Sequence, residues 1–527
     1  MLLQQIDRWA TLCPQRIVHQ SRDESLTYAE LKTYSDALAH WILRHVVSNR
    51  QPQVPIIVYG HKEAAMLVLF LACIKSGHPY IPIDISVPPE RLQQIVVRSG
   101  AAAILSPRDI PDLVVASGIV CQAQIHLPEW LSGAYPPQGS VLNEDEAELP
   151  ELIGYDDVWY IIFTSGSTGE PKGVQITQRA LATFLDWVNR EYTPRPQQEV
   201  FLNQAPFSFD LSVMDVYMAL TNGGTLWSVD QTHIANPREL FQSLAASDVS
   251  YWVSTPSFAE MCLLDRGFTA ELMPQLSHFL FCGEVLPNAV AAGLLQRFAQ
   301  ADVINMYGPT ECTVAVSGVN ITPDMAASNL PLPVGQSIAA CQIYICEPEG
   351  RTVLPSGVHG EIVIVGPNVS IGYLHQPELT ERVFLQWQEG ELSRQAYRTG
   401  DIGYWQDGLL YYQGRRDFQV KLHGYRIELG EIEAQLRQLP EVENAVVIPI
   451  VRRGKNAALE AYIALRSDPV MATAVSDMGN LLRQKLSQVL PAYMLPQRYT
   501  FISSIPLTAN GKADRNALRG GKYDPIR

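Results

Sequence analysis

Apolar and polar positions in the first half of the chain follow two periodicities in turn. Short apolar runs predict buried strands, and the longer segments between them, in which apolar residues recur at helical spacing, predict helices. The strand-like runs are residues 55–59, 80–85 and 102–105, and the helical segments between them are residues 61–76 and 88–98. This strand–helix–strand order indicates a mostly parallel sheet covered by helices.

The same pattern returns in the middle of the chain. Further strands are predicted at residues 159–163, 250–255, 279–281 and 303–305. Residues 109–150 contain many prolines and acidic side chains, and we expect them to form a surface connection between two such units.

The pattern changes after residue 360. Short alternating apolar runs separated by glycine and aspartate predict an antiparallel β region over residues 360–414. A polar segment, residues 415–417, follows, and the remaining stretch of about 110 residues is long enough for a small α+β domain. We therefore predict one domain over residues 1–415, a second over residues 416–527 and a hinge near Asp417.

Composition narrows the class of protein. The 527 residues are 47% apolar and 18% charged, which is typical of a globular protein. A net charge of −15 argues against general binding to nucleic acid or to an anionic membrane, because both need clustered Lys and Arg. A nucleotide ligand is still compatible with this charge, since a single loop can supply the donors.

The chain shows no pattern for secretion or membrane insertion. Its first residues lack a basic segment followed by an apolar one, and its longest apolar run, residues 64–74, is too short to span a bilayer. The eight cysteines are irregularly spaced and favour neither a zinc site nor a disulfide framework. We expect a reduced, cytoplasmic protein.

Residues 164–173 (TSGSTGEPKG) are the first candidate for chemistry. They follow a predicted buried strand and contain three glycines, four hydroxyl side chains and one lysine, Lys172. Glycine lets the backbone N–H groups approach an anion closely, so such a loop can wrap a polyphosphate. The segment lacks the Gly-Lys-Ser/Thr ending of the common P-loop, and a flexible Gly/Ser linker is the alternative interpretation.

Further candidates lie where strands are predicted to end. Tyr307 can stack on a base, Asn305 can read a base edge, and Glu311 can hold Mg²⁺. Asp401 lies on a predicted turn and can accept the two hydroxyls of a ribose, while Lys512 lies in a tight turn near the C-terminus. Taken singly, each of these residues also fits an ordinary turn or a solvated tip.

Together and in this order, the segments resemble the adenylate-forming enzymes, in particular the adenylation domains of nonribosomal peptide synthetases. The resemblance runs from residues 26–31 (LTYAEL) to residues 510–515 (NGKADR), and it includes residues 164–173, 307–311, 397–401 and 424–433. It implies an α/β fold with a large N-terminal region of two α/β subdomains plus a small β-barrel. A small, mobile α+β C-terminal domain, which acts as a lid, is implied to follow.

The resemblance also implies roles for individual residues. Lys512 is the implied catalytic lysine, ATP and Mg²⁺ are the implied cofactors, and Glu311 is the implied metal ligand. Asn305 and Tyr307 are the implied contacts of the adenine base. Asp401 and Arg415 are the implied contacts of the ribose. The full implied ATP-binding set is Thr164, Ser165, Lys172, Asn305, Met306, Tyr307, Gly308, Pro309, Thr310, Asp401, Tyr412, Gly414, Arg415 and Lys512.

The implied chemistry needs no general base. A substrate carboxylate is already ionised near neutral pH, so the barrier lies in bringing one anion to the anionic α-phosphate. Positioning and charge neutralisation therefore carry the catalysis, and a lysine such as Lys512 that bridges carboxylate and phosphate supplies both.

Asp210 is placed by the resemblance where amino-acid-activating members hold the substrate amine. A buried aspartate needs such a cation, whereas a helix cap, with Asp215 as the first-turn acid, is the alternative. The substrate-binding residues expected are Asp210, Leu211, Met214, Cys282, Met306, Val314 and Lys512, with Ser254, Leu280 and Ala315 as further lining. A pocket of this composition favours a small side chain.

Four segments narrow the resemblance to members that activate D-alanine and pass it to a separate carrier protein. They are residues 203–210, 254–258, 281–287 and 421–426, the last including His423. The implied partners are D-alanine and a phosphopantetheinylated carrier protein that acts in trans, because only fifteen residues follow Lys512. The implied pathway is the D-alanylation of teichoic acids, and Cys282 is implied to shape the pocket rather than to act as a nucleophile.

Three alternatives remain open at this stage. The first is a stand-alone adenylation enzyme for another small amino acid, such as L-alanine, glycine or proline. The second is an acyl-CoA synthetase, which Asp210 disfavours because a fatty acid has no ammonium group. The third is a non-catalytic nucleotide-binding protein, which the presence of both Glu311 and Lys512 disfavours.

Overall fold

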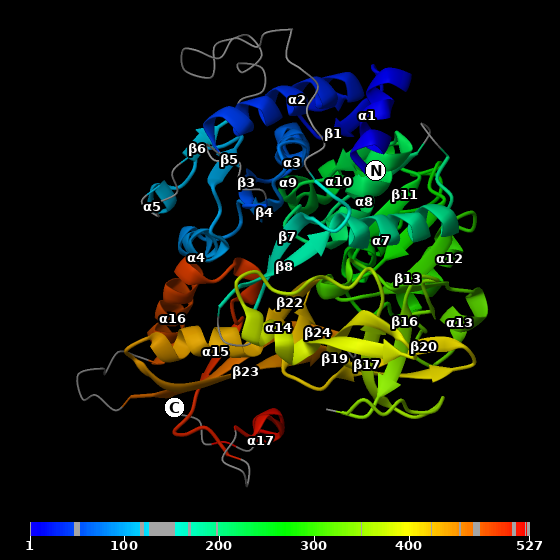
Figure 1. Ribbon diagram of the computed structural model, residues 1–527. Helices are drawn as coiled ribbons and strands as arrows, with labels where there is room; N and C mark the ends of the chain where they lie inside the picture. The colour runs from blue at the N-terminus through cyan, green and yellow to red at the C-terminus, as the bar shows by residue number, and fades with distance from the viewer. Residues whose placement is uncertain are drawn as a thin grey trace. The chain divides into compact units, whose positions relative to one another are not determined.

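The computed structural model (Figure 1) shows a mixed α/β protein, as predicted. The residues it describes are 2–46, 53–115, 121–125, 153–166, 170–195, 199–348, 350–422, 424–452, 455–466, 475–507, 513–521 and 523. The chain divides into two compact units. The large unit contains Met1–Ile85, Val96–Phe163 and Gly173–Gly414, and the small unit contains Ser86–Ile95, Thr164–Lys172 and Arg415–Arg527.

The largest sheet of the large unit has nine strands. In spatial order they are β15 (Gln336–Ser337), β14 (Ser317–Asn320), β13 (Asp302–Tyr307), β12 (His278–Phe281), β11 (Tyr251–Ser254), β9 (Val200–Asn203), β10 (Thr225–Ser228), β1 (Ile17–Gln20) and β2 (Ser25–Thr27). The strands from β1 to β13 in this order pair in parallel, while β2, β14 and β15 are antiparallel additions at the two ends. The parallel core confirms the prediction from the apolar runs.

A second sheet of six strands carries the predicted β–α–β–α segment. Its strands in spatial order are β6 (Cys121–Gln124), β5 (Ala103–Ser106), β3 (Ile56–Gly60), β4 (Tyr80–Asp84), β7 (Val158–Thr164) and β8 (Lys172–Thr177). The segment predicted to be only a surface connection contains β6, which pairs in parallel with β5, so that prediction was incomplete. The segment 121–124 is short and half polar, and it has no periodicity that would predict a strand.

Helices separate and cover the strands of these sheets. They are α1 (Leu2–Leu12), α2 (Tyr28–His45), α3 (Ala64–Lys75), α4 (Pro89–Ser99), α5 (Asp112–Val115), α7 (Gln178–Glu191), α8 (Leu211–Asn222), α9 (Gln231–Ala235), α10 (Pro237–Ala245), α11 (Pro256–Leu263), α12 (Asn288–Arg297), α13 (Pro323–Ala327), α14 (Pro377–Val383) and the 3₁₀ helix η1 (Thr310–Cys312). Helix α2 begins with a capping box, in which Thr27 and Glu30 satisfy each other's backbone N–H groups. Every residue of α3 is buried, as its unbroken apolar run predicts.

One apolar cluster joins the two sheets of the large unit. It contains side chains from β3 and β7 of the six-stranded sheet together with side chains from β9, β11 and helix α8. Polar contacts also reach α8 within this cluster, since Trp159 donates to the Tyr217 hydroxyl at 2.7 Å and Tyr80 bonds the same hydroxyl at 2.8 Å. Helix α8 is therefore fixed from both sheets.

The antiparallel region predicted after residue 360 is present. Its strands are β16 (Gln342–Cys346), β17 (Gly360–Val365), β18 (Phe384–Glu389), β19 (Leu392–Gln406) and β20 (Leu409–Arg415). They form one five-stranded sheet, in which β16, β17, β19 and β18 are neighbours and β20 pairs with β19. The small β-barrel that the family resemblance implied is not confirmed by this strand order.

The small unit has its own strands and core. Its strands are β21 (Gln419–Leu422), β22 (Tyr425–Glu428), β23 (Val442–Arg452), β24 (Lys455–Leu465) and β25 (Arg498–Phe501), and its helices are α15 (Leu429–Gln438), α16 (Val475–Val489), α17 (Arg515–Arg519) and the 3₁₀ helix η2 (Ala492–Met494). Strands β23 and β24 are antiparallel, and β25 adds to β24 in parallel. A separate apolar cluster between this sheet and helices α15 and α16 holds the unit together. Among the described helices of the whole chain, none combines the length and the apolar character that a membrane span requires.

Candidate active site

The carboxyl ends of three parallel strands meet at one edge of the nine-stranded sheet. Ser254 of β11 is paired with Phe281 of β12, and Phe281 is paired with Asn305 of β13. Ligands of open α/β sheets bind at this edge, because the loops that follow the strands lie side by side there. The predicted residues Cys282 and Tyr307 follow or end these same strands, so the fold brings them together.

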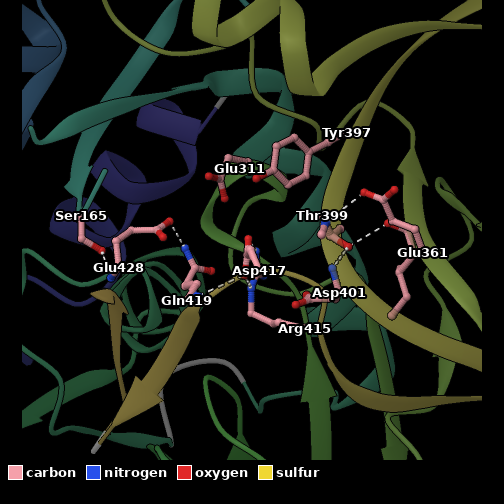
Figure 2. A network of polar contacts seen from close by, with 12 residues as sticks. Ser165, Glu311, Glu361, Tyr397, Thr399, Asp401, Arg415, Asp417, Gln419 and Glu428 are labelled. Atoms are coloured by element: carbon pink, nitrogen blue, oxygen red, sulfur yellow. Dashed lines mark hydrogen bonds and ion pairs between the residues drawn. The ribbon is translucent and has the colours of Figure 1, made fainter. Parts of the chain in front are cut away.

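Tyr307 and Asp401 form the best-defined polar contact of this region. The Tyr307 hydroxyl donates to the Asp401 carboxylate at 2.6 Å, and both side chains are buried. Burial, followed by the charge of Asp401, raises the pKa of Tyr307 well above its usual value, so the phenol stays a neutral donor. The backbone N–H of Asp401 also donates to Thr399 Oγ1 at 3.0 Å (Figure 2).

Two further predicted nucleotide contacts lie around this pair. The Asn305 amide is buried and donates to the carbonyl of Pro333 at 2.7 Å. The Tyr412 ring, on β20, lies 6.0 Å from the Tyr307 ring at an interplanar angle of 34°. The structure thus brings Asn305, Tyr307, Asp401 and Tyr412 into one part of the large unit.

Gly308 explains the close packing of the loop after β13. A Cβ atom added to it would lie 2.5 Å from Ala315 Cα and 2.7 Å from the Val314 carbonyl oxygen. Both are backbone atoms, so a side chain at this position would force the two segments apart. The predicted residues Pro309 and Thr310 follow directly and lead into η1.

Glu311 is a fully buried carboxylate in η1. Its Oε1 accepts a hydrogen bond from the Tyr373 hydroxyl at 2.7 Å, and the Tyr397 ring lies beside it (Figure 2). Within the described residues, no cluster of three or more His, Cys, Asp or Glu side chains is arranged for a metal. One carboxylate is nevertheless the donor set that suits Mg²⁺, which usually takes its other ligands from water and phosphates.

Asp210 precedes α8 without acting as its cap. Its backbone is helical (φ −61°, ψ −24°), and its side chain makes no capping hydrogen bond. An N-cap residue normally has extended backbone and accepts from the first turn, and Asp215 lies beyond that turn. The structure therefore contradicts the alternative in which Asp210 caps the helix.

The predicted apolar lining is shared by one buried cluster. Leu211, Met214, Cys282, Met306 and Val314 all belong to it. The Cys282 thiol lies 3.5 Å from the carbonyl oxygen of Val314, which fixes two of these residues against each other. These residues come from α8, from β13 and from the loops after β12 and η1, and the pocket that they are predicted to line stays a prediction.

The segment that supplies Val314 has unusual backbone. Thr313 and Val314 have φ values of 58° and 66°, a region that residues branched at Cβ rarely adopt. Thr313 Oγ1 donates to the Asn368 carbonyl at 2.8 Å and helps hold this conformation. Such backbone outliers are concentrated at functional sites, because the surrounding structure must impose them.

Residues 164–172 of the predicted phosphate loop belong to the small unit. The buried Ser165 hydroxyl donates to the carbonyl of Arg426 at 2.8 Å and accepts from the N–H of Glu428 at 3.2 Å (Figure 2). Thr164 Oγ1 is buried and has no partner among the described residues, and Lys172 is buried at the start of β8. A buried hydroxyl without a partner fits a loop whose donors are reserved for an anion.

Arg415 and Asp417 form a bidentate ion pair near the start of residues 415–527 of the small unit. Arg415 Nε and Nη2 lie 2.7 Å from the two Asp417 carboxylate oxygens (Figure 2). Burial alone would raise the pKa of Asp417, but the hydrogen bonds and charge of Arg415 outweigh it and lower this pKa. Gly414, the residue before them, has a φ of 148°.

Several residues of the site were not predicted. Tyr373 donates to Glu311 from 62 positions further along the chain, and no local pattern marks it. Thr399 lies two positions before Asp401, inside the segment 397–401, but no role was predicted for it. The predicted residues Lys512 and His423 lie outside the described residues, as do residues 167–169 of the phosphate loop.

Comparisons with known proteins identify the family of the chain. Residues 6–374 match the family described as AMP-binding enzyme, and residues 431–512 match the AMP-binding enzyme C-terminal domain. Proteins named D-alanine–D-alanyl carrier protein ligase from Bacillus mycoides (strain KBAB4) and Bacillus cereus (strain ATCC 10987 / NRS 248) are each 46% identical over 517 residues, covering 98% of both chains. A solved structure of an NRPS protein containing adenylation and PCP domains is similar with a TM-score of 0.81 and 26% identity, over 98% of this chain and 83% of that one.

The matched residues include both units, and the first family match alone covers more than half of the chain. The motifs at residues 164–173 and 307–311 lie inside that match. The family predicted from them is therefore confirmed, and the chain belongs to the AMP-binding enzymes.

Proposed function

We propose that this enzyme is an ATP-dependent, AMP-forming ligase that activates D-alanine as D-alanyl-AMP, releases pyrophosphate and passes the D-alanyl group to the phosphopantetheine thiol of a carrier protein in trans. The relatives named D-alanine–D-alanyl carrier protein ligase, 46% identical along almost the whole chain, support this activity. The proposed reaction consumes ATP, and the enzyme is proposed to act in the cytoplasm. The teichoic acid pathway stays a prediction.

The observation that carries the amino-acid part of the proposal is the state of Asp210. Its carboxylate is not used to cap α8, and Met214, four positions further along the chain, belongs to the same buried cluster as Cys282. A carboxylate in such surroundings is stabilised by a cation, and the ammonium group of an amino acid supplies one. A pocket closed by Met, Cys and Val side chains accommodates a methyl group better than a longer chain.

The nucleotide part rests on the residues after β13 and on β19. Tyr307 offers a ring for adenine, and Asp401, held by the Tyr307 hydroxyl at 2.6 Å, offers a carboxylate for ribose hydroxyls. Glu311 is the carboxylate that would hold Mg²⁺, which supplies charge neutralisation on the phosphates when it is bound. Thr164, Ser165 and Lys172 are proposed to bind the β- and γ-phosphates, and Lys512 the reacting α-phosphate.

Amino-acid-dependent exchange of pyrophosphate into ATP tests the proposal. D-alanine should support exchange better than L-alanine, glycine, serine or proline, and Asp210→Asn should raise the KM for D-alanine without a comparable change for ATP. A preference for L-alanine, glycine or proline would instead favour an adenylation enzyme for that amino acid. Lys512→Ala should abolish exchange while ATP binding survives, and near-normal exchange would remove Lys512 from its role.

We also propose that residues 1–415 and 416–527 act as core and lid, with the hinge near Asp417. Domain closure needs a few residues that absorb backbone rotation, and the Arg415–Asp417 pair lies in this segment. Asp417→Pro should impair transfer to the carrier protein more than pyrophosphate exchange. Equal loss of both half-reactions would contradict this hinge.

A further inference from the structure

A buried polar network lies in the large unit beside the segment that carries Asp210. At its centre is Lys62, which follows β3 and is 4% exposed. Its ammonium group donates to the side-chain oxygen of Asn203 and to the backbone carbonyl of Ala205. It also lies 4.7 Å from the centre of the Phe207 ring. A charge so deeply buried is costly, and none of the proposed chemistry uses it.

The network continues from Asn203 into helix α8. The Asn203 amide donates at 2.9 Å to Asp215, a fully buried carboxylate in the second turn of α8. Asn203 also accepts from the Ser228 hydroxyl at 3.0 Å, and that hydroxyl bonds the His19 ring at 3.0 Å. The Asn203 side chain thus links Lys62 to Asp215, because its oxygen accepts from the ammonium group and its nitrogen donates to the carboxylate.

These contacts hold both ends of the segment 203–215. At its start, Lys62 binds Ala205 and faces Phe207. At its end, Asp215 ties α8 to Asn203. Between them the chain is closed by a hydrogen bond from Phe209 N–H to the Pro206 carbonyl at 2.9 Å.

Helix α8 is also tied to the turn just before Asp210. The Ser212 hydroxyl donates to the Phe209 carbonyl at 2.7 Å and reaches the Phe207 carbonyl at 3.4 Å. Asp210 therefore lies in a segment whose geometry is set on both sides by buried polar contacts.

We propose that Lys62 is a positioning residue for the amino-acid site, which acts by holding the segment 203–215 so that the Asp210 carboxylate faces the substrate ammonium group. This inference rests on the proposed function. Buried charges are often no more stabilising than well-packed apolar residues, so a charge retained here is better explained by the single geometry it imposes. Burial lowers the pKa of Lys62 to about 8, and the charges of Asp215, Asp84 and Asp230 oppose that shift, so the side chain remains mostly protonated near neutral pH.

The test compares two buried lysines of the same unit. Lys62→Met removes the ammonium group and keeps most of the volume. Lys75→Met is the matched control, because Lys75 is also buried and its ammonium group binds Asp36 at 2.5 Å, Asp7 at 3.0 Å and Ser35 at 2.9 Å, away from the segment 203–215. Both variants are expected to lower thermal stability, so stability does not distinguish them.

The substrate ammonium group provides the discriminating measurement. In Lys62→Met the KM for D-alanine in pyrophosphate exchange should rise at least about tenfold, the worth of one charged hydrogen bond. Propionate, which is alanine without its ammonium group, is tested as a competitive inhibitor. Its Ki and the KM for ATP should change by less than about twofold, as at sites without a shared contact. Lys75→Met should leave all three constants within that range.

Two results would overturn the inference. One is an equal rise in the D-alanine KM and the propionate Ki for Lys62→Met, which indicates a general distortion of the pocket. The other is a D-alanine KM that does not change. If Lys62→Met does not fold, Asp215→Asn takes its place with the same expected direction. Failure of the proposed function is seen separately, because the wild-type enzyme would then exchange pyrophosphate with another amino acid or with none.

Discussion

Removing a single oxygen atom from Tyr307 tests whether the Tyr307–Asp401 contact orders the nucleotide part of the site. Tyr307→Phe keeps the ring, which is proposed to face adenine, and deletes only the hydroxyl that donates to Asp401 at 2.6 Å. Both side chains are buried, with exposed fractions of 5% for Tyr307 and 3% for Asp401. The variant therefore leaves a buried carboxylate with one hydrogen bond fewer.

The expected size of the effect follows from that burial. A hydrogen bond to a charged group contributes about 1.5–3 kcal/mol, and water does not easily replace a donor at a buried carboxylate. We expect the free energy of unfolding to fall by about this amount. Since Asp401 is proposed to accept the ribose hydroxyls, the KM for ATP should rise about tenfold, which corresponds to about 1.4 kcal/mol. The KM for D-alanine should change much less.

Tyr404→Phe is the matched control. Tyr404 is on the same strand as Asp401, is half-buried and stacks on His359, and its hydroxyl makes no hydrogen bond with the described residues. Urea unfolding followed by tryptophan fluorescence and pyrophosphate exchange at varied ATP give the two measurements. If Tyr307→Phe matches Tyr404→Phe in both, the Tyr307–Asp401 bond is not what orders the ribose contact.

Three further predictions concern other parts of the chain. Burial, aided by the charge of Lys62, lowers the pKa of His19 to about 3, so between about pH 7.5 and 5.5 the His19 side chain gains a proton only in the unfolded chain. Over that interval the free energy of unfolding of the wild type should fall by about 1.4 kcal/mol more than that of His19→Gln. Equal losses in the two proteins would contradict this. Gly308→Ala would place a Cβ 2.5 Å from backbone and should reduce pyrophosphate exchange at least about tenfold, whereas Gly293→Ala, whose Cβ meets only a side chain at 3.4 Å, should leave it unchanged. Arg91→Met leaves the buried Glu431 carboxylate without its ion pair, and the free energy of unfolding measured in urea should fall by about 3–5 kcal/mol. Adding Glu431→Leu should restore most of that loss. An unchanged free energy of unfolding in the single variant would show that the pair is unimportant.

The local patterns of the sequence predicted the parallel core well. Strands β3, β4 and β5 and the helix between the first two follow the expected apolar runs, because a buried strand or helix must be apolar along its length. Strand β6 was missed, since its four residues carry too little pattern. The barrel implied by the resemblance is not confirmed, because strand pairing is decided by contacts between distant segments.

The residues proposed to contact the nucleotide were expected from the motifs, and the structure shows which side chains hold them. Asp401 was expected on a turn, but it lies within strand β19, so that part of the prediction was wrong. The fold adds the Tyr307 hydroxyl, which comes from 94 positions earlier in the chain. Glu311 was expected as a metal ligand, and the fold adds Tyr373. Such partners follow no periodicity and become visible only when their strands are placed.

The sequence by itself determined the family and the chemical class of the site, because a phosphate loop, a helix or a buried strand requires particular residues at fixed local spacing. Only the tertiary structure decided that Asp210 does not cap α8 and that Lys62 is buried against Asn203, 141 positions away. A single lysine in a sequence is normally predicted to be exposed to solvent, since burying its charge is costly unless distant partners compensate for it. Whether those partners exist depends on long-range packing, which no short window of residues contains.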